Sequence, residues 1–308
     1  MSRSPFLPWL LAGIVGIALA APSGCHRQQA AAEPADLEDA PTDTPGDRGL
    51  EVAPVVLEAD TTEPRPPLPD GFVRLSETAP EIALEIRYTT SYNFVGEPID
   101  SYLAPECILV EEAARALKAV ARDLEAQGLG LKVYDCYRPQ SAVRHFVMWA
   151  NTPDALEMKR AFYPEEPKGQ LFSRGYIATR SGHSRGGTVD LTLVRLPVEE
   201  TIRREYPSPD GPLPLPRCDR PLTGPTGPDI EGGGRLHEGD LDMGTAYDCL
   251  STASATDSPE VSAEARRNRD RLRAAMSRHG FRNYSKEWWH FTLRDEPHPR
   301  THFDFPVE

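Results

Sequence analysis

The chain has 308 residues, 39% of them hydrophobic, which allows one large domain or two small ones with an apolar core. Its formal net charge of -13 argues against a nucleic acid or an anionic membrane surface as the main partner, because both require basic patches. Part of this negative charge lies in the N-terminal tail and therefore says little about the field at a binding site.

The first residues have the pattern of an export signal. Arg3 precedes an apolar run over 6–21, which is too short for a transmembrane helix but has the length of a signal-peptide core. The Ser-Gly-Cys ending resembles a lipoprotein processing site, with 1–24 as the signal and Cys25 as the lipid-bearing residue, although Pro22 fits that site poorly. The alternative is simple cleavage nearby, with Cys25 free or paired. Both alternatives predict export to the periplasm or cell envelope, with membrane contact only through such an anchor.

Residues 25–70 are rich in Ala, Pro, Asp, Glu and Thr and contain few large apolar side chains. Such a segment cannot bury enough surface to offset the entropy lost on ordering. We therefore predict a disordered acidic tether or, without lipidation, a free tail, followed by a folded domain over 71–308.

Export gives meaning to the four cysteines that follow Cys25, because exported proteins commonly form disulfides. Four cysteines allow three pairings, and sequence alone does not choose between them. We favour Cys107–Cys136 and Cys218–Cys249, because each pair closes a loop within one region. A cysteine metal site is not expected, since no C-x-x-C spacing occurs.

The folded region alternates between strand and helix patterns. Apolar residues alternate with polar ones where strands are predicted and recur at helical spacing elsewhere. Thr152 with Pro153, and Ser258 with Pro259, have the pattern of helix starts, and Gly128 follows a helix as a C-cap residue would. The predicted strands cover 72–75, 82–88, 131–135, 187–196 and 288–293, and the predicted helices cover 108–127, 140–150, 153–162 and 258–278.

Residues 197–240 are rich in Pro and Gly and show no sustained periodicity. They are predicted to form a long surface insertion, which a Cys218–Cys249 bond would hold. His237 is interpreted as a solvated loop histidine. His298 and His302 lie in an irregular, proline-containing tail and are not expected to bind a metal.

Two segments a hundred residues apart carry the chemistry: Ser181-Gly-His183 with Asp190, and Glu287-Trp-Trp-His290. Two imidazoles and a carboxylate suit Zn²⁺, which in catalytic sites takes three protein ligands and leaves one position open. One zinc ion per chain is therefore predicted on His183, Asp190 and His290. The alternative is that the histidines have ordinary structural roles.

Glu287 is the candidate general base for a water whose pKa zinc lowers to roughly 7. Residues three apart on a regular strand face opposite ways, so Glu287 must lie in a turn or bulge that enters the strand of His290. Arg138, in Tyr137-Arg138-Pro139, follows a predicted strand and would stabilise an anionic tetrahedral oxygen. Its alternative role is a structural salt bridge.

These segments, together with Met243-Gly-Thr-Ala-Tyr-Asp248, resemble the D-alanyl-D-alanine dipeptidases of the VanX type, which are zinc enzymes of the D,D-peptidase group. The resemblance runs from about Gly71 to Leu293. It implies an α+β fold with a central, mainly antiparallel sheet, flanking helices and a zinc cleft on one face. The roles it implies are zinc binding by His183, Asp190 and His290, Glu287 as base, and Arg138 as transition-state stabiliser.

The same resemblance implies that Ser181 hydrogen-bonds a small D,D-dipeptide and that Asp248 holds its free ammonium group. An enzyme that trims long peptidoglycan stems has no ammonium group at that position. The alternative interpretation of Asp248 is a purely structural role. Because an exported enzyme meets D-Ala-D-Ala as a product of wall turnover, recovery of wall peptides is an alternative role to glycopeptide resistance.

Two other functions remain as alternatives. The first is a zinc D,D-carboxypeptidase or endopeptidase that acts on intact peptidoglycan. The second is a non-catalytic wall-binding module, against which Glu287 and Arg138 argue, because a binding module needs neither a base nor an oxyanion partner.

Overall fold

The computed structural model describes most of the predicted domain, over residues 65–198, 215–222, 234–235 and 237–308. The predicted signal 1–24, Cys25, the tether up to residue 64 and much of the predicted insertion lie outside the described residues. Within the described residues, no helix is long and apolar enough to cross a membrane.

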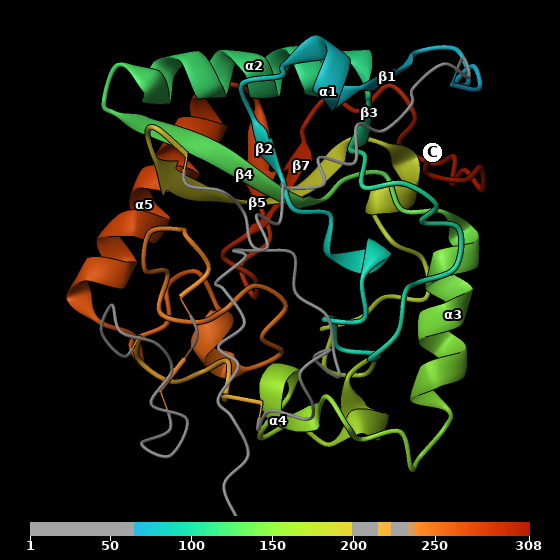
Figure 1. Ribbon diagram of the computed structural model, residues 1–308, viewed down its shortest axis with the longest axis vertical. Helices are drawn as coiled ribbons and strands as arrows, with labels where there is room; N and C mark the ends of the chain where they lie inside the picture. Colours follow the sequence, from blue (N-terminus) through green and yellow to red (C-terminus); the bar gives the residue numbers. More distant parts are fainter. Residues whose placement is uncertain (1–64, 199–214, 223–233, 236) are drawn as a thin grey trace, which may run out of the picture. The chain divides into compact units, whose positions relative to one another are not determined.

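A five-stranded sheet forms the centre of this region (Figure 1). One pair of neighbouring strands in it runs parallel, and the other three pairs are antiparallel. A second, two-stranded antiparallel sheet pairs β1 (Phe72–Arg74) with β3 (Ile108–Val110). The predicted mixture of helices and strands is thus confirmed. In spatial order the central strands are β2 (Ala83–Leu84), β4 (Leu129–Asp135), β5 (Thr188–Arg195), β7 (His290–Leu293) and β6 (Phe281–Asn283).

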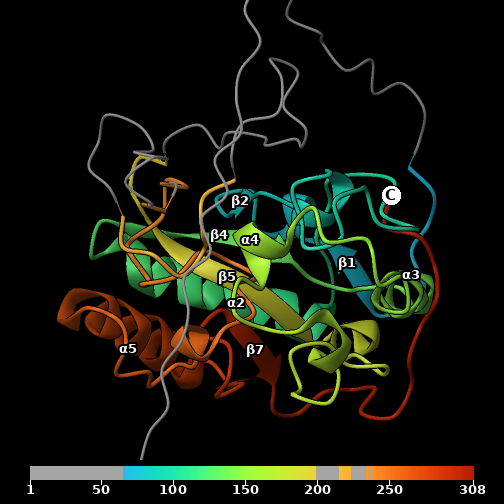
Figure 2. The ribbon, with the colours of Figure 1, turned by 90° about the horizontal axis from the view of Figure 1, so that it is seen from below.

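Two helices cover one face of this sheet, α2 (Glu111–Glu125) and α5 (Ala263–Arg278) (Figure 2). They contact each other as well as the strands. The apolar positions of α2, among them Leu117 and Leu124, are fully buried, as the helical periodicity predicts. The shorter helices are α1 (Leu75–Thr78), α3 (Gln140–Ala150) and α4 (Lys159–Phe162).

Strand β5 lies in the middle of the sheet, and side chains on both of its faces are buried, with only Arg195 at its end exposed. Val189, Leu191 and Leu193 share one face, while Asp190 lies on the other between two threonines. The alternation predicted for this strand therefore places one carboxylate on the face opposite the apolar one.

Three predicted helices start later than expected, two because of local side-chain hydrogen bonds and one because of strand pairing. The Thr152 hydroxyl donates to the Met148 carbonyl at the end of α3 instead of capping a new helix, and only Lys159–Phe162 is helical after it. Ser258 accepts from the Glu260 amide in a turn, whereas Ser262 caps α5. Likewise, α2 starts three residues later than predicted because Ile108–Val110 pairs with β1.

The predicted strand over 82–88 is wrong beyond Leu84. Residues Arg87–Thr89 form a 3₁₀ turn, and the Arg87 guanidinium is buried between Glu85 and Glu238 at 2.6 and 3.3 Å. Glu85 and Arg87, the polar residues of the alternation that predicted the strand, therefore belong to an ion-pair network with Lys132 and Glu238. The short strand β6 was not predicted, since three residues carry no readable periodicity.

Both favoured cysteine pairings are present as disulfides. Cys107–Cys136 joins the start of β3 to the end of β4, with 5.3 Å between Cα atoms. Cys218–Cys249 joins a described part of the predicted insertion to the segment after Asp248, with 5.5 Å between Cα atoms.

Both ends of the described region pack on the domain. Arg65, in the predicted tether, donates to Glu106 at 2.9 Å, and Leu68 packs against the core. At the other end, the backbone of Val307 pairs with that of Tyr102, and the Phe303 amide donates to the Ser184 carbonyl at 2.8 Å. The irregular tail is thereby fixed beside the turn that contains His183.

Candidate active site

Strands β5 and β7 bring two of the three predicted metal ligands together, because Asp190 and His290 are direct cross-strand neighbours. His183 comes from the 3₁₀ turn His183–Arg185 just before β5. Gly186 ends this turn with φ of 80°, and a Cβ atom there would clash with the Phe72 ring. A glycine is therefore required for the chain to turn from His183 into the strand of Asp190.

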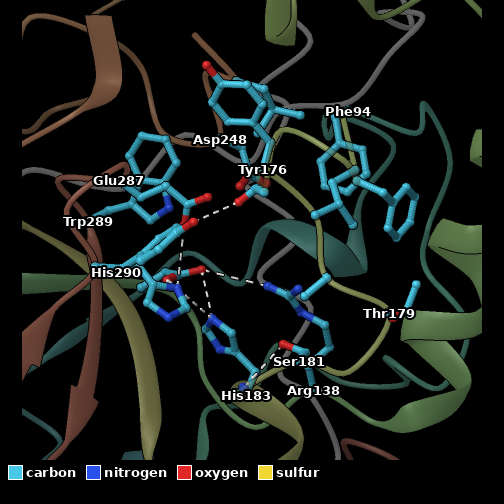
Figure 3. Close-up of a pocket in the computed structure, with 18 of the residues that line it drawn as sticks. Phe94, Arg138, Tyr176, Thr179, Ser181, His183, Asp248, Glu287, Trp289 and His290 are labelled. Atoms are coloured by element: carbon cyan, nitrogen blue, oxygen red, sulfur yellow. Dashed lines mark hydrogen bonds and ion pairs between the residues drawn. The ribbon is translucent and has the colours of Figure 1, made fainter. Parts of the chain in front are cut away.

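The three side chains converge on one point (Figure 3). His183 Nε2 lies 3.2 Å from His290 Nδ1 and 3.3 Å from Asp190 Oδ2, and His290 Nδ1 lies 3.0 Å from Asp190 Oδ1. Asp190 Oδ1 is buried and accepts no hydrogen bond from the described residues. One ligand atom from each of the three side chains can therefore meet at a common point.

Neighbouring groups orient these side chains. His183 Nδ1 donates to the Cys136 carbonyl at 2.7 Å, so the neutral ring keeps the lone pair of Nε2 for the shared point. The Tyr247 hydroxyl donates to Asp190 Oδ2 at 3.2 Å. Burial lowers the pKa of His290, which favours the neutral imidazole that a metal requires.

Glu287 lies in the turn between β6 and β7, as predicted, and its Oε2 is 3.5 Å from His290 Nδ1. The turn is held by Trp288, whose amide donates to the Ser254 carbonyl and whose indole donates to Thr245. Burial raises the pKa of Glu287 well above its usual value, and the nearby Asp190 carboxylate adds to the shift. Glu287 can therefore retain a proton at higher pH than an exposed carboxyl group.

Arg138 follows β4 and precedes α3, at the position predicted for it. Its Nε and Nη2 donate to one Asp135 oxygen at 2.9 and 2.7 Å, and Nη2 lies 3.8 Å from Asp190 Oδ2. The guanidinium also lies over the Tyr88 and Phe146 rings. It thus forms the salt bridge given above as its alternative role and also lines the candidate site.

Asp248 is buried on the same cavity, in a backbone conformation with φ of 57°. It accepts a hydrogen bond from the Tyr88 hydroxyl at 2.8 Å. Burial and the Asp190 charge raise the pKa of Asp248 to about 7, against the opposing effects of Arg138 and Tyr88. Ser181 Oγ accepts from the His183 amide at 3.2 Å, which leaves its hydroxyl proton free to donate elsewhere.

One cavity of about 550 Å³ collects these groups, within the size range of small-molecule sites. Aromatic side chains, including Phe94 and Phe172, line part of its wall. The seven predicted site residues all line it: Arg138, Ser181, His183, Asp190, Asp248, Glu287 and His290.

Sequence reasoning missed Asp135, Tyr88 and Tyr247, which orient the predicted residues. Asp135 had a signal, because it is an acidic residue at the end of an apolar strand three positions before Arg138. Tyr88 and Tyr247 had none, because their hydroxyl groups meet carboxylates 160 and 57 positions away in the chain.

Comparison with known proteins places the chain among the peptidases. A family model described as D-Ala-D-Ala dipeptidase matches residues 69–202 and 235–308, which include all seven site residues. The chain therefore belongs to the D-Ala-D-Ala dipeptidase family. The match leaves out residues 203–234, within the predicted insertion.

Individual relatives agree with this assignment. The chain is 34% identical over 236 residues to a D-alanyl-D-alanine dipeptidase of Streptomyces coelicolor. The aligned residues make up 77% of this chain and 98% of that protein. It is 33% identical over 238 residues to a protein of the same name from Enterococcus faecium, with the same coverage. An Escherichia coli protein of that name is 28% identical over 76% of this chain and 86% of its own length.

Proposed function

We propose that this protein is a zinc dipeptidase that hydrolyses D-Ala-D-Ala, or closely related D,D-dipeptides, to free amino acids. The observation that carries the proposal is the convergence of His183, Asp190 and His290 within 3.0–3.3 Å, with Glu287 3.5 Å from His290. The names of the relatives support the choice of substrate.

The residues fit zinc. Tetrahedral ligand atoms at about 2.0–2.2 Å from zinc lie roughly 3.3–3.6 Å apart, close to the spacing of these nitrogen and oxygen atoms. The unpartnered Asp190 Oδ1 and the tautomer of His183 are further reasons for the assignment. When bound, zinc would polarise the peptide carbonyl and acidify a water molecule.

Glu287 would take a proton from the attacking water and pass it to the leaving amine. Its buried position supports this role, because a raised pKa lets a carboxyl group hold that proton between the two transfers. Its backbone is fixed by Asn283, whose side-chain amide donates to the Glu287 carbonyl at 2.9 Å. The base therefore lies on an ordered turn directly beside the ligand set.

Arg138 would donate to the oxygen that becomes anionic in the tetrahedral state. Asp135 engages its Nε and Nη2, whereas Nη1 has no hydrogen-bond partner among the described residues. The Asp135 pair also fixes the plane of the guanidinium, so the remaining donor is oriented before substrate binds.

Asp248 would bind the ammonium group of the dipeptide, and the Ser181 hydroxyl would donate a hydrogen bond to an acceptor oxygen of the dipeptide. The depth of Asp248 favours a dipeptide over a long stem peptide, because a buried carboxylate is costly without a cation and a stem peptide has no ammonium group there.

The decisive experiment is a hydrolysis assay over D,D-, L,D- and L,L-dipeptides and an intact muropeptide, with and without a chelator. We expect chelator-sensitive release of D-Ala from D-Ala-D-Ala and none from the muropeptide. Glu287→Ala should retain zinc while turnover falls roughly 10²–10⁴-fold. Release from the muropeptide alone would instead identify a carboxypeptidase or endopeptidase, and near-full activity of Glu287→Ala would refute the proposed base.

We also propose that the protein is exported and anchored through Cys25, with a role in recovery of wall peptides. The Cys107–Cys136 and Cys218–Cys249 disulfides support export, because disulfides persist mainly in oxidising compartments. Cell fractionation of the full chain and its Cys25→Ser variant tests this. Loss of membrane association in the variant alone is expected, and a reduced cytoplasmic protein would contradict export.

A further inference from the structure

We propose that Arg180 binds the C-terminal carboxylate of the dipeptide and makes the enzyme select substrates with a free carboxylate. This inference rests on the proposed dipeptidase function. It concerns a residue that neither the sequence patterns nor the proposed chemistry uses.

The charges that line the cavity are unevenly paired. Three carboxylates, Asp190, Asp248 and Glu287, face two guanidinium groups. Arg138 is already engaged by Asp135, as described above. Arg180 is exposed and forms no ion pair with a carboxylate among the described residues. It is thus the cavity cation whose charge is not already neutralised by the described part of the chain.

A neutral group positions Arg180. Its Nη2 donates to His302 Nδ1 at 3.3 Å, which requires an unprotonated imidazole nitrogen. Partial burial and the positive charge of Arg180 lower the pKa of His302, in agreement with this neutral form. His302 precedes Phe303, whose amide is bonded to Ser184. The contact therefore holds the guanidinium at the cavity without cancelling its charge.

The residues on either side of Arg180 are also hydrogen-bond donors. Thr179 and Ser181 carry hydroxyl groups and line the same cavity. The Ser181 oxygen is occupied by the His183 amide, so its proton is free to donate. A guanidinium flanked by two hydroxyl groups matches a carboxylate, whose two oxygens accept several hydrogen bonds.

This set lies apart from Asp248. Figure 3 shows Asp248 near Tyr176 in the upper part of the view, whereas Ser181 lies next to His183 in the lower part and Thr179 lies to the right. An extended dipeptide spans about 7 Å and carries its ammonium and carboxylate groups at opposite ends. Its zwitterion therefore matches a cavity that is lined by a buried carboxylate, Asp248, and by a guanidinium, Arg180, whose charge no described carboxylate neutralises.

The test compares Arg180→Ala, Arg180→Lys and the wild type on two substrates, D-Ala-D-Ala and the same dipeptide with an amidated C-terminus. We expect Arg180→Ala to lower kcat/KM for the free acid about 10- to 100-fold, mainly through KM, because one charge-assisted interaction is lost. On the amide the variant should differ little from wild type. Arg180→Lys should recover part of the loss, since it restores the charge without the planar donor pair. The matched control is Arg271→Ala, an exposed arginine of α5 outside the cavity.

The outcomes separate this inference from the proposed function. A wild-type enzyme that hydrolyses no D,D-dipeptide refutes the proposed function itself. If the wild type is active but Arg180→Ala is unchanged, Arg180 does not bind the carboxylate. An equal loss on the free acid and the amide, or a loss in the Arg271→Ala control as well, also overturns the assignment, because neither depends on the substrate carboxylate.

Discussion

The two sides of the cavity are built differently. On one side, Asp190 and His290 are paired across two strands, and His183 and Arg138 lie at the ends of strand-linked turns. On the other side, Asp248 and the 172–182 segment lie in loops, and Asp248 is held by the hydroxyl of Tyr88, which lies in the 3₁₀ turn Arg87–Thr89.

This difference follows from what each side is proposed to do. A metal requires ligand atoms placed to within a few tenths of an ångström, which strand pairing provides. Substrate-contacting loops can vary in sequence and length while the sheet stays unchanged. The two disulfides reinforce one side each, because Cys136 is the hydrogen-bond partner of His183 and Cys249 directly follows Asp248.

The largest effect is expected from the sheet side. Asp190→Ala removes the one carboxylate of the ligand set, so we expect loss of bound zinc and of detectable dipeptidase activity. Asp248→Asn, on the loop side, should keep zinc and raise KM. Metal content by mass spectrometry or atomic absorption, measured beside activity, distinguishes the two, and a zinc-loaded Asp190→Ala protein would refute the ligand assignment.

Arg138→Ala should lower kcat roughly 10²–10³-fold while zinc content stays at one per chain, because a donor to the developing anion is lost. Asp135→Asn is the matched test of positioning, since it weakens the hold on the guanidinium but leaves Arg138 present. Its loss should be smaller. If Asp135→Asn lowered kcat more than Arg138→Ala does, Asp135 would have a role in the reaction beyond positioning Arg138.

Removing the disulfides one at a time compares the two sides directly, because they close loops of nearly equal length, 29 and 31 residues. Each double alanine variant should lose about 2–4 kcal/mol of unfolding free energy. Only loss of Cys107–Cys136 should weaken zinc binding, through the carbonyl that orients His183. Loss of Cys218–Cys249 should instead raise KM. Denaturant titration measures the unfolding free energy, chelator competition the zinc affinity, and steady-state kinetics KM. If both disulfide variants changed zinc affinity and KM alike, the proposed difference between the two sides of the cavity would be wrong.

The smallest effect is expected in the pH dependence of the stability of the metal-free protein. Because the pKa of Asp248 is about 7 when folded and near 4 when unfolded, the folded state holds the extra proton between these values. Its contribution to stability is thus fully present below pH 4 and is lost as pH rises towards 7. The lowered pKa of His290 makes stability rise with pH instead. The contribution of Asp248 is therefore isolated by comparing the wild type with a variant that lacks only this carboxylate. Melting temperatures of wild type minus Asp248→Asn should fall across this window, and a flat difference would refute the raised pKa.

Local patterns predicted the elements that hold most of the site. The boundaries of α3 agree exactly, and β4 and β5 agree within two residues, because long runs of regular periodicity dominate these segments. The starts of α4 and α5 were misplaced, since serine and threonine can cap a helix, close a turn or bond the preceding carbonyl with similar ease. Sequence does not reveal which of these backbone partners lies within reach.

The amino-acid sequence by itself determined the candidate ligands and the placement of the candidate base in a turn before its strand, because these depend on residue type and spacing along the chain. Tertiary structure alone decided the pairing of the cysteines, the bond of Tyr88 to Asp248 and the contact of Arg180 with His302. The physical reason is the range of the contacts. Side chains 122 and 160 positions apart leave no periodic trace, and only the packed chain brings them within hydrogen-bonding distance.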